Sequence, residues 1–248
     1  ELFPPLEHHQ AALRSASSAD GTKIAVTDVN GTVLVWDSTT GDESHTLIGH
    51  INDQGDNQAV QDVAFSPNGE LLASAGNDGK VVLWELASEQ QRHVFEQDGI
   101  AIRVVFTPDG TRLIASISGG DDSAEIVKVW DVESYEELLT LSGHSGSIQG
   151  VAVSPDGAWI ATASRDGMIK LWNADTGQEL FTISDRTAEN WDVNFNSDGT
   201  QMLVARSDGT AVIYILDHDD LLALAESRTT RSLTDDECRR YLHKDQCE

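Results

Sequence analysis

The stretch that decides the fold is residues 151–177, VAVSPDGAWIATASRDGMIKLWNADTG. It contains two turn signals, Asp156-Gly157 and Asp166-Gly167, each flanked by short runs of alternating or continuous apolar residues. An Asp-Gly pair between two such runs is a strong signal for a β-hairpin, because glycine accepts the positive φ angles of a tight turn. The stretch therefore predicts a meander of short antiparallel strands and not a helical unit.

This pattern recurs five times. A second clear copy, VAFSPNGELLASAGNDGKVVLWE, covers residues 63–85, and weaker copies begin at Ser15, Val104 and Val193. The aromatic residues that anchor the copies, spaced 48, 46, 42 and 42 residues apart, are Trp36, Trp84, Trp130, Trp172 and Tyr214. A recurring period of this length is the signature of a repeat architecture, built here from short strands. We assign repeats to residues 1–216, at about 1–40, 41–88, 89–134, 135–176 and 177–216.

Composition excludes several classes of function. The 248 residues include 16 Lys or Arg and 42 Asp or Glu, which gives a formal net charge of −26. Nucleic acids and anionic membrane surfaces attract Lys/Arg-rich patches, so we expect neither as a direct partner. No apolar run approaches the roughly 20 residues of a membrane span, and no secretory signal is visible, so we expect a cytoplasmic protein.

The repeats resemble WD40 repeats, which build the blades of β-propellers. The residues that carry the resemblance are Gly49-His50, Gly143-His144 and the Trp-Asp pairs that begin at Trp36 and Trp130. The resemblance implies an all-β fold of five recognisable four-stranded blades. It also implies that each repeat opens with an outer strand that completes the preceding blade.

The resemblance further implies a structural hydrogen-bond tetrad within a blade. The fourth copy matches it with His144, Ser164, Asp166 and Trp172. The second copy keeps a His, an Asp and a Trp but has Gly76 at the position aligned with Ser164. Because these residue types recur at blade spacing, we interpret them as scaffold and not as a catalytic Ser-His-Asp set.

Five copies leave the ring undecided, since the common propeller of this family has seven blades and propellers span about four to eight. The first residues, Glu1–Pro4, copy the phrase of an outer strand and would complete a fifth blade in a closed five-blade ring. The same phase would arise if this chain were part of a larger propeller that lacks upstream blades.

Residues 217–248 break the pattern and predict a short helical tail. We expect this tail to pack on the propeller as a clasp, and the alternative is a docking peptide for another domain. Residues 219–226 read as one helix, and Thr234 with Glu237 forms a capping box for a second. The text LTDDECRRYLH at 233–243 resembles tails that follow propellers in large bacterial signalling proteins, so we expect a C-terminal portion of such a protein. Cys238, His243 and Cys247 lack a fourth ligand with zinc-finger spacing, so we expect no metal. We expect two thiols, and the alternative is a local disulfide in an oxidising compartment.

Two acidic insertions are the first candidate interaction site. They occupy residues 51–58 and 119–125, and by the topology of the family they open on the same face. Their acidic residues are Asp53, Asp56, Asp121, Asp122 and Glu125. A negative rim suits a basic peptide or protein. The alternative is a solvated loop.

A second candidate is the position seven residues before the turn Asp or Asn of each copy, which in this family points toward the mouth of the central channel. It holds Leu13, Gln61, Ile102, Gln149 and Trp191, with the neighbours Asp62, Arg103 and Asp192. A Trp beside a polar rim resembles an interface anchor, although it could equally pack against the next blade.

The resulting hypothesis is a non-catalytic scaffold or sensor that binds a protein or peptide, or other domains or chains of the same signalling complex, without a cofactor. One alternative is a propeller enzyme, a hydrolase or lyase, which would need His or carboxylate groups and a metal at the channel mouth. Another is an assembly fragment that completes the ring of another chain.

Overall fold

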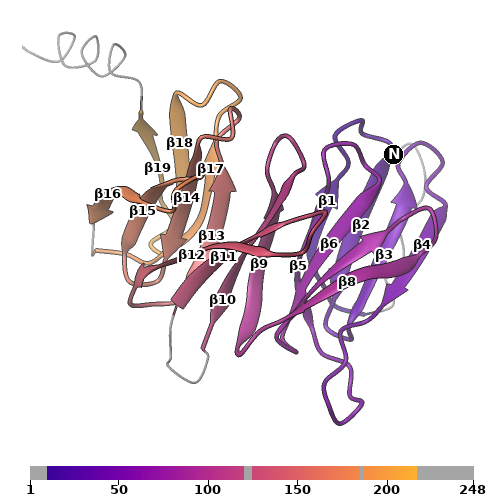
Figure 1. The fold of residues 1–248 in the computed structure, drawn as a ribbon. Coiled ribbons are helices and arrows are strands. Elements are labelled where there is room, and N and C mark those ends of the chain that lie inside the picture. Colours follow the sequence, from indigo (N-terminus) through magenta and orange to yellow (C-terminus); the bar gives the residue numbers. More distant parts are fainter. Residues whose placement is uncertain (1–9, 120–124, 185–186, 217–248) are drawn as a thin grey trace, which may run out of the picture.

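The structure is a computed structural model, and it describes residues 10–119, 125–184 and 187–216. This part of the chain is all-β, with 19 strands in five antiparallel sheets and no helix. Figure 1 shows the sheets following one another in chain order, from the sheet of β1 to the sheet of β17. The predicted helical tail at 217–248 and the predicted closing strand Glu1–Pro4 lie outside the described residues.

Four sheets have four strands and the last has three. The first contains β1 (Ala12–Ser17), β2 (Lys23–Asp28), β3 (Thr32–Asp37) and β4 (Glu43–Ile48). The second contains β5 (Val60–Phe65), β6 (Leu71–Gly76), β7 (Lys80–Glu85) and β8 (Gln90–Glu96). The third contains β9 (Ile100–Phe106), β10 (Arg112–Ser118), β11 (Glu125–Asp131) and β12 (Glu137–His144). The fourth contains β13 (Ile148–Val153), β14 (Trp159–Ser164), β15 (Met168–Asn173) and β16 (Glu179–Ser184). The fifth contains β17 (Asn190–Phe195), β18 (Gln201–Arg206) and β19 (Ala211–Ile215).

The turn signals form the hairpins that the sequence predicts. In the fourth sheet the Ser154 hydroxyl donates to Asp156 at 2.6 Å and accepts the Trp159 backbone N–H at 2.9 Å. Gly157 closes this turn with a φ of 76°, which a residue with a Cβ rarely adopts. The first three sheets use the same hydroxyl-to-Asp or hydroxyl-to-Asn contact in their first turns. The repeat therefore reproduces its turn chemistry as well as its strands.

Repeats and sheets are offset by one strand. β12 opens the fourth sequence repeat, yet it pairs with β11 and so completes the third sheet. This is the topology that the resemblance implied. Each sheet thus receives its outer strand from the next repeat, which ties consecutive repeats together.

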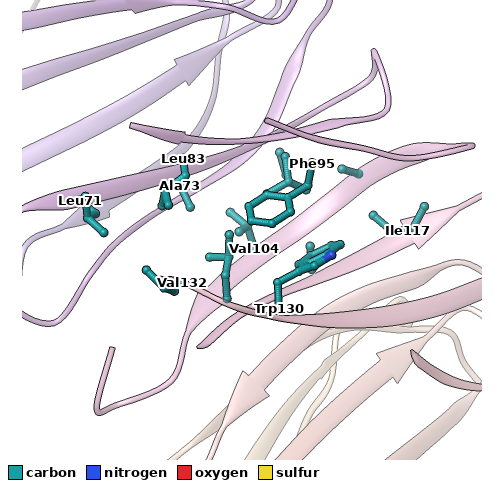
Figure 2. Packing of buried hydrophobic residues seen from close by; sticks show 13 residues of the cluster. Leu71, Ala73, Leu83, Phe95, Val104, Ile117, Trp130 and Val132 are labelled. Atoms are coloured by element: carbon teal, nitrogen blue, oxygen red, sulfur yellow. The ribbon is translucent and has the colours of Figure 1, made fainter. Parts of the chain in front are cut away.

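The hydrophobic core lies between consecutive sheets. Figure 2 shows the cluster between the second and third sheets, where Leu83 and Phe95 meet Trp130 and Ile117. The Phe95 and Trp130 rings have centroids 4.8 Å apart, and every side chain in this group is at most 5% exposed. Similar clusters fill the three other gaps between neighbouring sheets. Each blade is therefore stabilised by its neighbours and not by a core of its own.

The described residues form no closed ring. Extensive contacts join the innermost strands of consecutive sheets, β1 to β5, β5 to β9, β9 to β13 and β13 to β17, but not β17 to β1. The fifth sheet has no described strand beyond β19.

Candidate functional site

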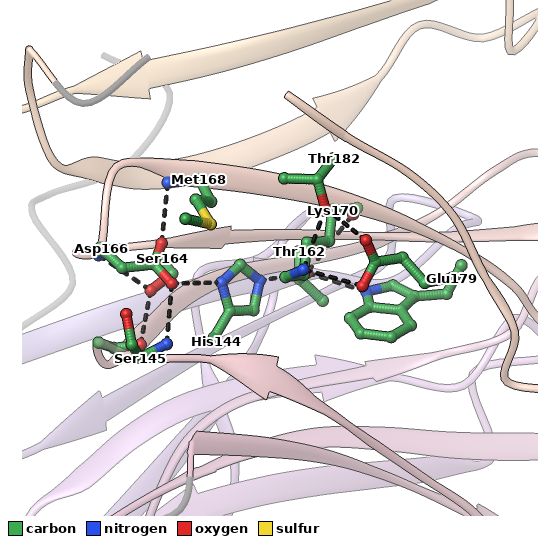
Figure 3. Close-up of polar contacts among 11 residues, drawn as sticks. His144, Ser145, Thr162, Ser164, Asp166, Met168, Lys170, Glu179 and Thr182 are labelled. Carbon is green, nitrogen blue, oxygen red and sulfur yellow. Dashed lines mark hydrogen bonds and ion pairs between the residues drawn. The ribbon is translucent and has the colours of Figure 1, made fainter. Parts of the chain in front are cut away.

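The His, Asp and Trp of the fourth repeat meet in one buried network (Figure 3). His144 Nδ1 lies 2.9 Å from Asp166 Oδ2, and His144 Nε2 lies 2.8 Å from Thr162 Oγ1. Trp172 Nε1 donates to the same Thr162 oxygen at 3.0 Å. The hydroxyl of the tetrad is therefore Thr162.

Ser164 was the predicted hydroxyl, and that prediction is wrong. Its Oγ donates to the Gly146 carbonyl at 2.5 Å and accepts the Asp166 backbone N–H at 3.1 Å, so it fixes the turn and does not reach the indole. Thr162 and Ser164 are two residues apart on β14 and point to the same side of the strand. The strand pattern alone does not say which of the two lies beside Trp172.

The direction of each hydrogen bond in the network follows from its two ends. The Trp172 indole N–H can only donate and an ionised Asp166 carboxylate can only accept. Thr162 thus accepts from Trp172 and donates to His144 Nε2, while His144 Nδ1–H donates to Asp166. We infer a neutral imidazole with its proton on Nδ1.

The second repeat has the same network in complete form. His50 Nδ1 lies 2.9 Å from Asp78, and both His50 Nε2, at 2.7 Å, and Trp84 Nε1, at 2.8 Å, contact Ser74 Oγ. Gly76 is therefore not a missing hydroxyl: a Cβ there would lie 2.3 Å from the His50 ring. The signal that the sequence offered was the hydroxyl four residues before the Asp in both copies.

Burial decides what these networks can do. Desolvation lowers the pKa of His144, against the opposing effect of Asp166. Burial acts to raise the pKa of Asp166, but hydrogen bonds from the Ser145 N–H, His144 and the Met168 N–H outweigh it and lower that pKa. Both His side chains are almost wholly shielded from solvent. The networks hold blades together and offer no accessible nucleophile.

The first insertion forms a small ordered hairpin between β4 and β5. Ile51 and Asn57 form an isolated β-bridge, and the side-chain amide oxygen of Asn52 accepts a hydrogen bond from the Asp56 backbone N–H at 2.8 Å. Lys80 Nζ donates to the Ile51 carbonyl at 2.8 Å and anchors the hairpin to the second sheet. Asp53 and Asp56 are exposed at its tip. We call the end of the sheets that carries this hairpin, His50 and His144 the His-turn face.

The second insertion is described only in part. Asp121 and Asp122 lie outside the described residues. Glu125 begins β11, is half-buried, and accepts a hydrogen bond from Ser118 Oγ at 2.9 Å. Its carboxylate is thus turned toward the strand beside it and not displayed like that of Asp53.

The innermost strands of all five sheets line a central cavity of about 660 Å³. Its charged lining residues alternate in sign along the chain of sheets: Arg14, Asp62, Arg103 and Asp192. The fourth sheet has Gly150 at this position, where a Cβ would lie 2.8 Å from the backbone of Asp192. The cavity therefore carries paired charges of both signs and no net acidic field of its own.

Arg103 and Asp62 are held within this wall. Arg103 is buried, and its guanidinium donates through Nε to the Gln149 carbonyl and through Nη2 to the Trp191 carbonyl at 3.5 Å. Asp62 accepts the Val104 backbone N–H at 3.1 Å. Burial raises the pKa of Asp62 to about 6, although Arg103 acts to lower it. The main role of Arg103 is therefore to link the third, fourth and fifth sheets by hydrogen bonds, and not to contact a partner.

The other predicted rim residues lie just outside the cavity. Gln61 donates to Asn77 at 2.9 Å, and Gln149 donates to Ser147 at 2.8 Å, so both amides contact turns of the His-turn face. Trp191 is 47% exposed, and the Arg165 guanidinium lies 5.6 Å from its ring centroid. Trp191 thus offers an accessible aromatic surface beside a cation.

Within the described ranges no group of three or more His, Cys, Asp or Glu side chains is placed to hold a metal ion. The part of the chain that the structure covers also contains no helix long and apolar enough to cross a membrane.

Comparison with known proteins agrees with the fold. The family model described as "WD domain, G-beta repeat" matches residues 41–85 and 135–173. An uncharacterized WD repeat-containing protein of Synechocystis is 33% identical over 194 residues, covering 62% of this chain and 54% of the relative. A pre-mRNA-processing factor 19 homolog of Arabidopsis thaliana is 26% identical, covering 68% and 31%. A WD repeat-containing protein of Schistosoma mansoni is 27% identical, covering 66% and 51%. The chain thus spans about half, or less, of the length of these relatives.

The stacked four-stranded sheets and their His–hydroxyl–Trp networks define a repeat protein of β-propeller blades. Residues 41–85 and 135–173 match WD40 repeats, and the chain is similar to WD-repeat proteins.

Proposed function

We propose that this protein is a non-catalytic interaction scaffold that binds a basic protein segment through its His-turn face. The WD40 repeats and the WD-repeat relatives support a protein–protein interaction scaffold. We further propose that the chain belongs to a cytoplasmic bacterial signalling protein. The Synechocystis relative supports only the bacterial setting, and the resemblance of the tail supports the signalling role.

The observation that carries the proposal is the insertion hairpin. Its backbone is fixed by Asn52 and Lys80, which lowers the entropy cost of binding a partner. Within the described residues, the carboxylates of Asp53 and Asp56 have no hydrogen-bond or ion-pair partner, so their charge is available to a ligand. A groove of about 310 Å³ beside the hairpin is lined by Asp53, Gln54, Asn77, Lys80, Gln97 and neighbouring residues.

The chemistry of the groove indicates the partner. Its lining is mostly amide and carboxylate, which suits the ammonium or guanidinium group of a Lys or Arg together with backbone amides of an extended peptide. Trp191, on the innermost strand of the fifth sheet, does not line this groove and offers a separate accessible aromatic ring. We therefore expect a Lys/Arg-rich segment as the ligand.

A charge-matched pair of variants tests this proposal. A fluorescently labelled Lys/Arg-rich peptide is titrated with the intact chain, with Asp53→Lys/Asp56→Lys, and with Asp42→Lys/Glu136→Lys, which makes the same charge change at the opposite end of the strands. Each exposed charge contributes about 0.2–1 kcal/mol, so we expect the first variant to weaken binding about tenfold and the second much less. Equal weakening by both variants would show non-specific attraction to the net charge and would reject this face as the site.

A further inference from the structure

The fifth sheet exposes an apolar face, whereas the corresponding faces of the other four sheets are buried. We define the forward face of a sheet as the side that packs on the next sheet along the chain. The second strand of each sheet has one equivalent position on this forward face. The first four sheets have Ala25, Ala73, Ile114 and Ala161 there, and the fifth has Leu203. The cross-strand partners of these residues are Val35, Leu83, Val129, Leu171 and Ile213.

Exposure at these positions separates the fifth sheet from the rest. In the first four sheets every one of these side chains is at most 2% exposed. In the fifth sheet Leu203 is 47% and Ile213 is 61% exposed, and Ala205 and Ala211 beside them are exposed too. Leu203 and Ile213 are directly paired across β18 and β19, so they form one continuous patch. Apolar pairs of this kind are stabilising when covered and favour association when bare.

The patch differs from a blade-to-blade interface at its inner end. In the other sheets the innermost strands pack on each other, and the forward position there holds Ala16, Ala64, Val105 or Ala152. The fifth sheet has Asn194 instead, exposed and paired with Leu203. A further blade would press its inner strand on this amide. The apolar area is confined to β18 and β19, which fits an occupant narrower than a sheet.

The size of the patch favours an occupant on the same chain. A face of three strands and about five residues spans roughly 14 by 17 Å, or about 240 Å². A stable interface between separate proteins buries about 800 Å² on each partner. A tethered segment needs less contact, because its effective concentration is in the millimolar range.

We propose that residues 219–226 of the same chain fold back over β18 and β19 and cover Leu203 and Ile213. The chain is held on the sheet as far as Leu216, whose backbone N–H donates to the Thr200 carbonyl at 2.8 Å. This leaves residues 217 and 218 to make the turn. The sequence of the segment places Leu221, Leu224 and Ala225 at helical spacing on one side. A helix of eight residues is about 12 Å long and about 10 Å wide, close to the dimensions of two paired strands.

Disulfide trapping tests the placement. In a background with Cys238→Ser and Cys247→Ser, which removes the only two thiols of the chain, the variant Ile213→Cys/Leu224→Cys is oxidised mildly. A disulfide requires Cα atoms within about 7 Å, so docking should give an intramolecular bond at least about ten times faster than in Leu138→Cys/Leu224→Cys. Leu138 is the control because it is similarly exposed, at 43%, on the outer strand of the third sheet.

A second measurement does not depend on introduced thiols. Hydrogen exchange of residues 219–226 should be slowed in the intact chain and accelerated about tenfold or more by Ile213→Asp, but not by Ile48→Asp on the exposed outer strand of the first sheet. Exchange at unprotected rates in the intact chain would overturn the proposal. So would equal trapping of both cysteine pairs, or a bond between molecules, which would assign the patch to a second copy. None of these outcomes bears on the insertion hairpin, so the proposed function is tested separately.

Discussion

At the scale of single residues, the blade networks depend on one hydroxyl oxygen. Thr162 accepts from the buried Trp172 indole and lies 2.8 Å from His144 Nε2, whereas Ser164 serves the turn. We expect Thr162→Val, which keeps the shape, to lower the free energy of unfolding by about 2–4 kcal/mol, since it leaves two buried polar groups without a partner. Ser164→Ala should cost about 1 kcal/mol. Urea unfolding checks the order, and a larger loss for Ser164→Ala would return the tetrad role to that serine.

Asp62 gives the molecule a pH dependence of identifiable origin. Burial raises its pKa to about 6 in the folded state from an ordinary value of 3.8, with Arg103 and Arg14 opposing the rise. Between these values the folded state binds more protons than the unfolded state, so the contribution of this group to stability declines as pH rises from about 4 to about 6. Asp62→Asn should remove this decline, which is at most about 3 kcal/mol.

The comparison of the two proteins near pH 4 and near pH 7 isolates Asp62. The lowered pKa of His144 acts in the opposite sense, because stability is lost as pH falls below the unfolded His pKa of about 6.5. That effect is present in both proteins and cancels in the difference. Identical pH slopes for the two proteins would show that Asp62 is ionised in the fold throughout this range.

At the scale of strands and sheets, burial between neighbours decides which apolar residues matter. Leu83 is fully buried between the second and third sheets, whereas Leu180 on the outer strand β16 is 44% exposed. We expect Leu83→Ala to cost about 2–5 kcal/mol through lost burial and a cavity. Leu180→Ala should cost less than about 1 kcal/mol. Denaturant unfolding measures both, and similar costs would contradict the packing of the sheets on each other.

Local features of the strands and sheets could be predicted from the sequence, whereas contacts between strands could not. The repeats, turns and strand offset follow from local patterns such as Asp156-Gly157, so they could be predicted. The choice between Thr162 and Ser164 depends on cross-strand proximity, and the inward turn of Glu125 depends on Ser118, so neither could be predicted from one strand. The open forward face around Ile213 could not be predicted either, because its residues match those that other sheets bury. Whether a face is covered depends on what lies beyond the sheet.

At the scale of the whole molecule, charge and packing act against each other. The net charge is −26. Some described Lys and Arg ion pairs, such as Arg112–Asp175 and Lys170–Glu179, have a nitrogen–oxygen distance of 3.0 Å or less. In these pairs the carboxylate side chain remains 39–88% exposed. Exposed pairs contribute little, so mutual repulsion of the acids should dominate the electrostatic part of the unfolding free energy. Added salt should therefore stabilise this fold.

Raising NaCl from about 0.01 M to about 0.5 M shortens the Debye length from about 30 Å to well under 10 Å, so repulsion between separate blades is screened. We expect Tm to rise by roughly 3–6 °C, which for a chain of this size corresponds to about 1–2 kcal/mol. Asp42→Lys/Glu136→Lys changes the net charge from −26 to −22 and should show a smaller rise, because less repulsion remains to be screened. Thermal unfolding at several salt concentrations measures both. A Tm that falls with salt would mean that the ion pairs between strands and sheets outweigh the repulsion among the acids.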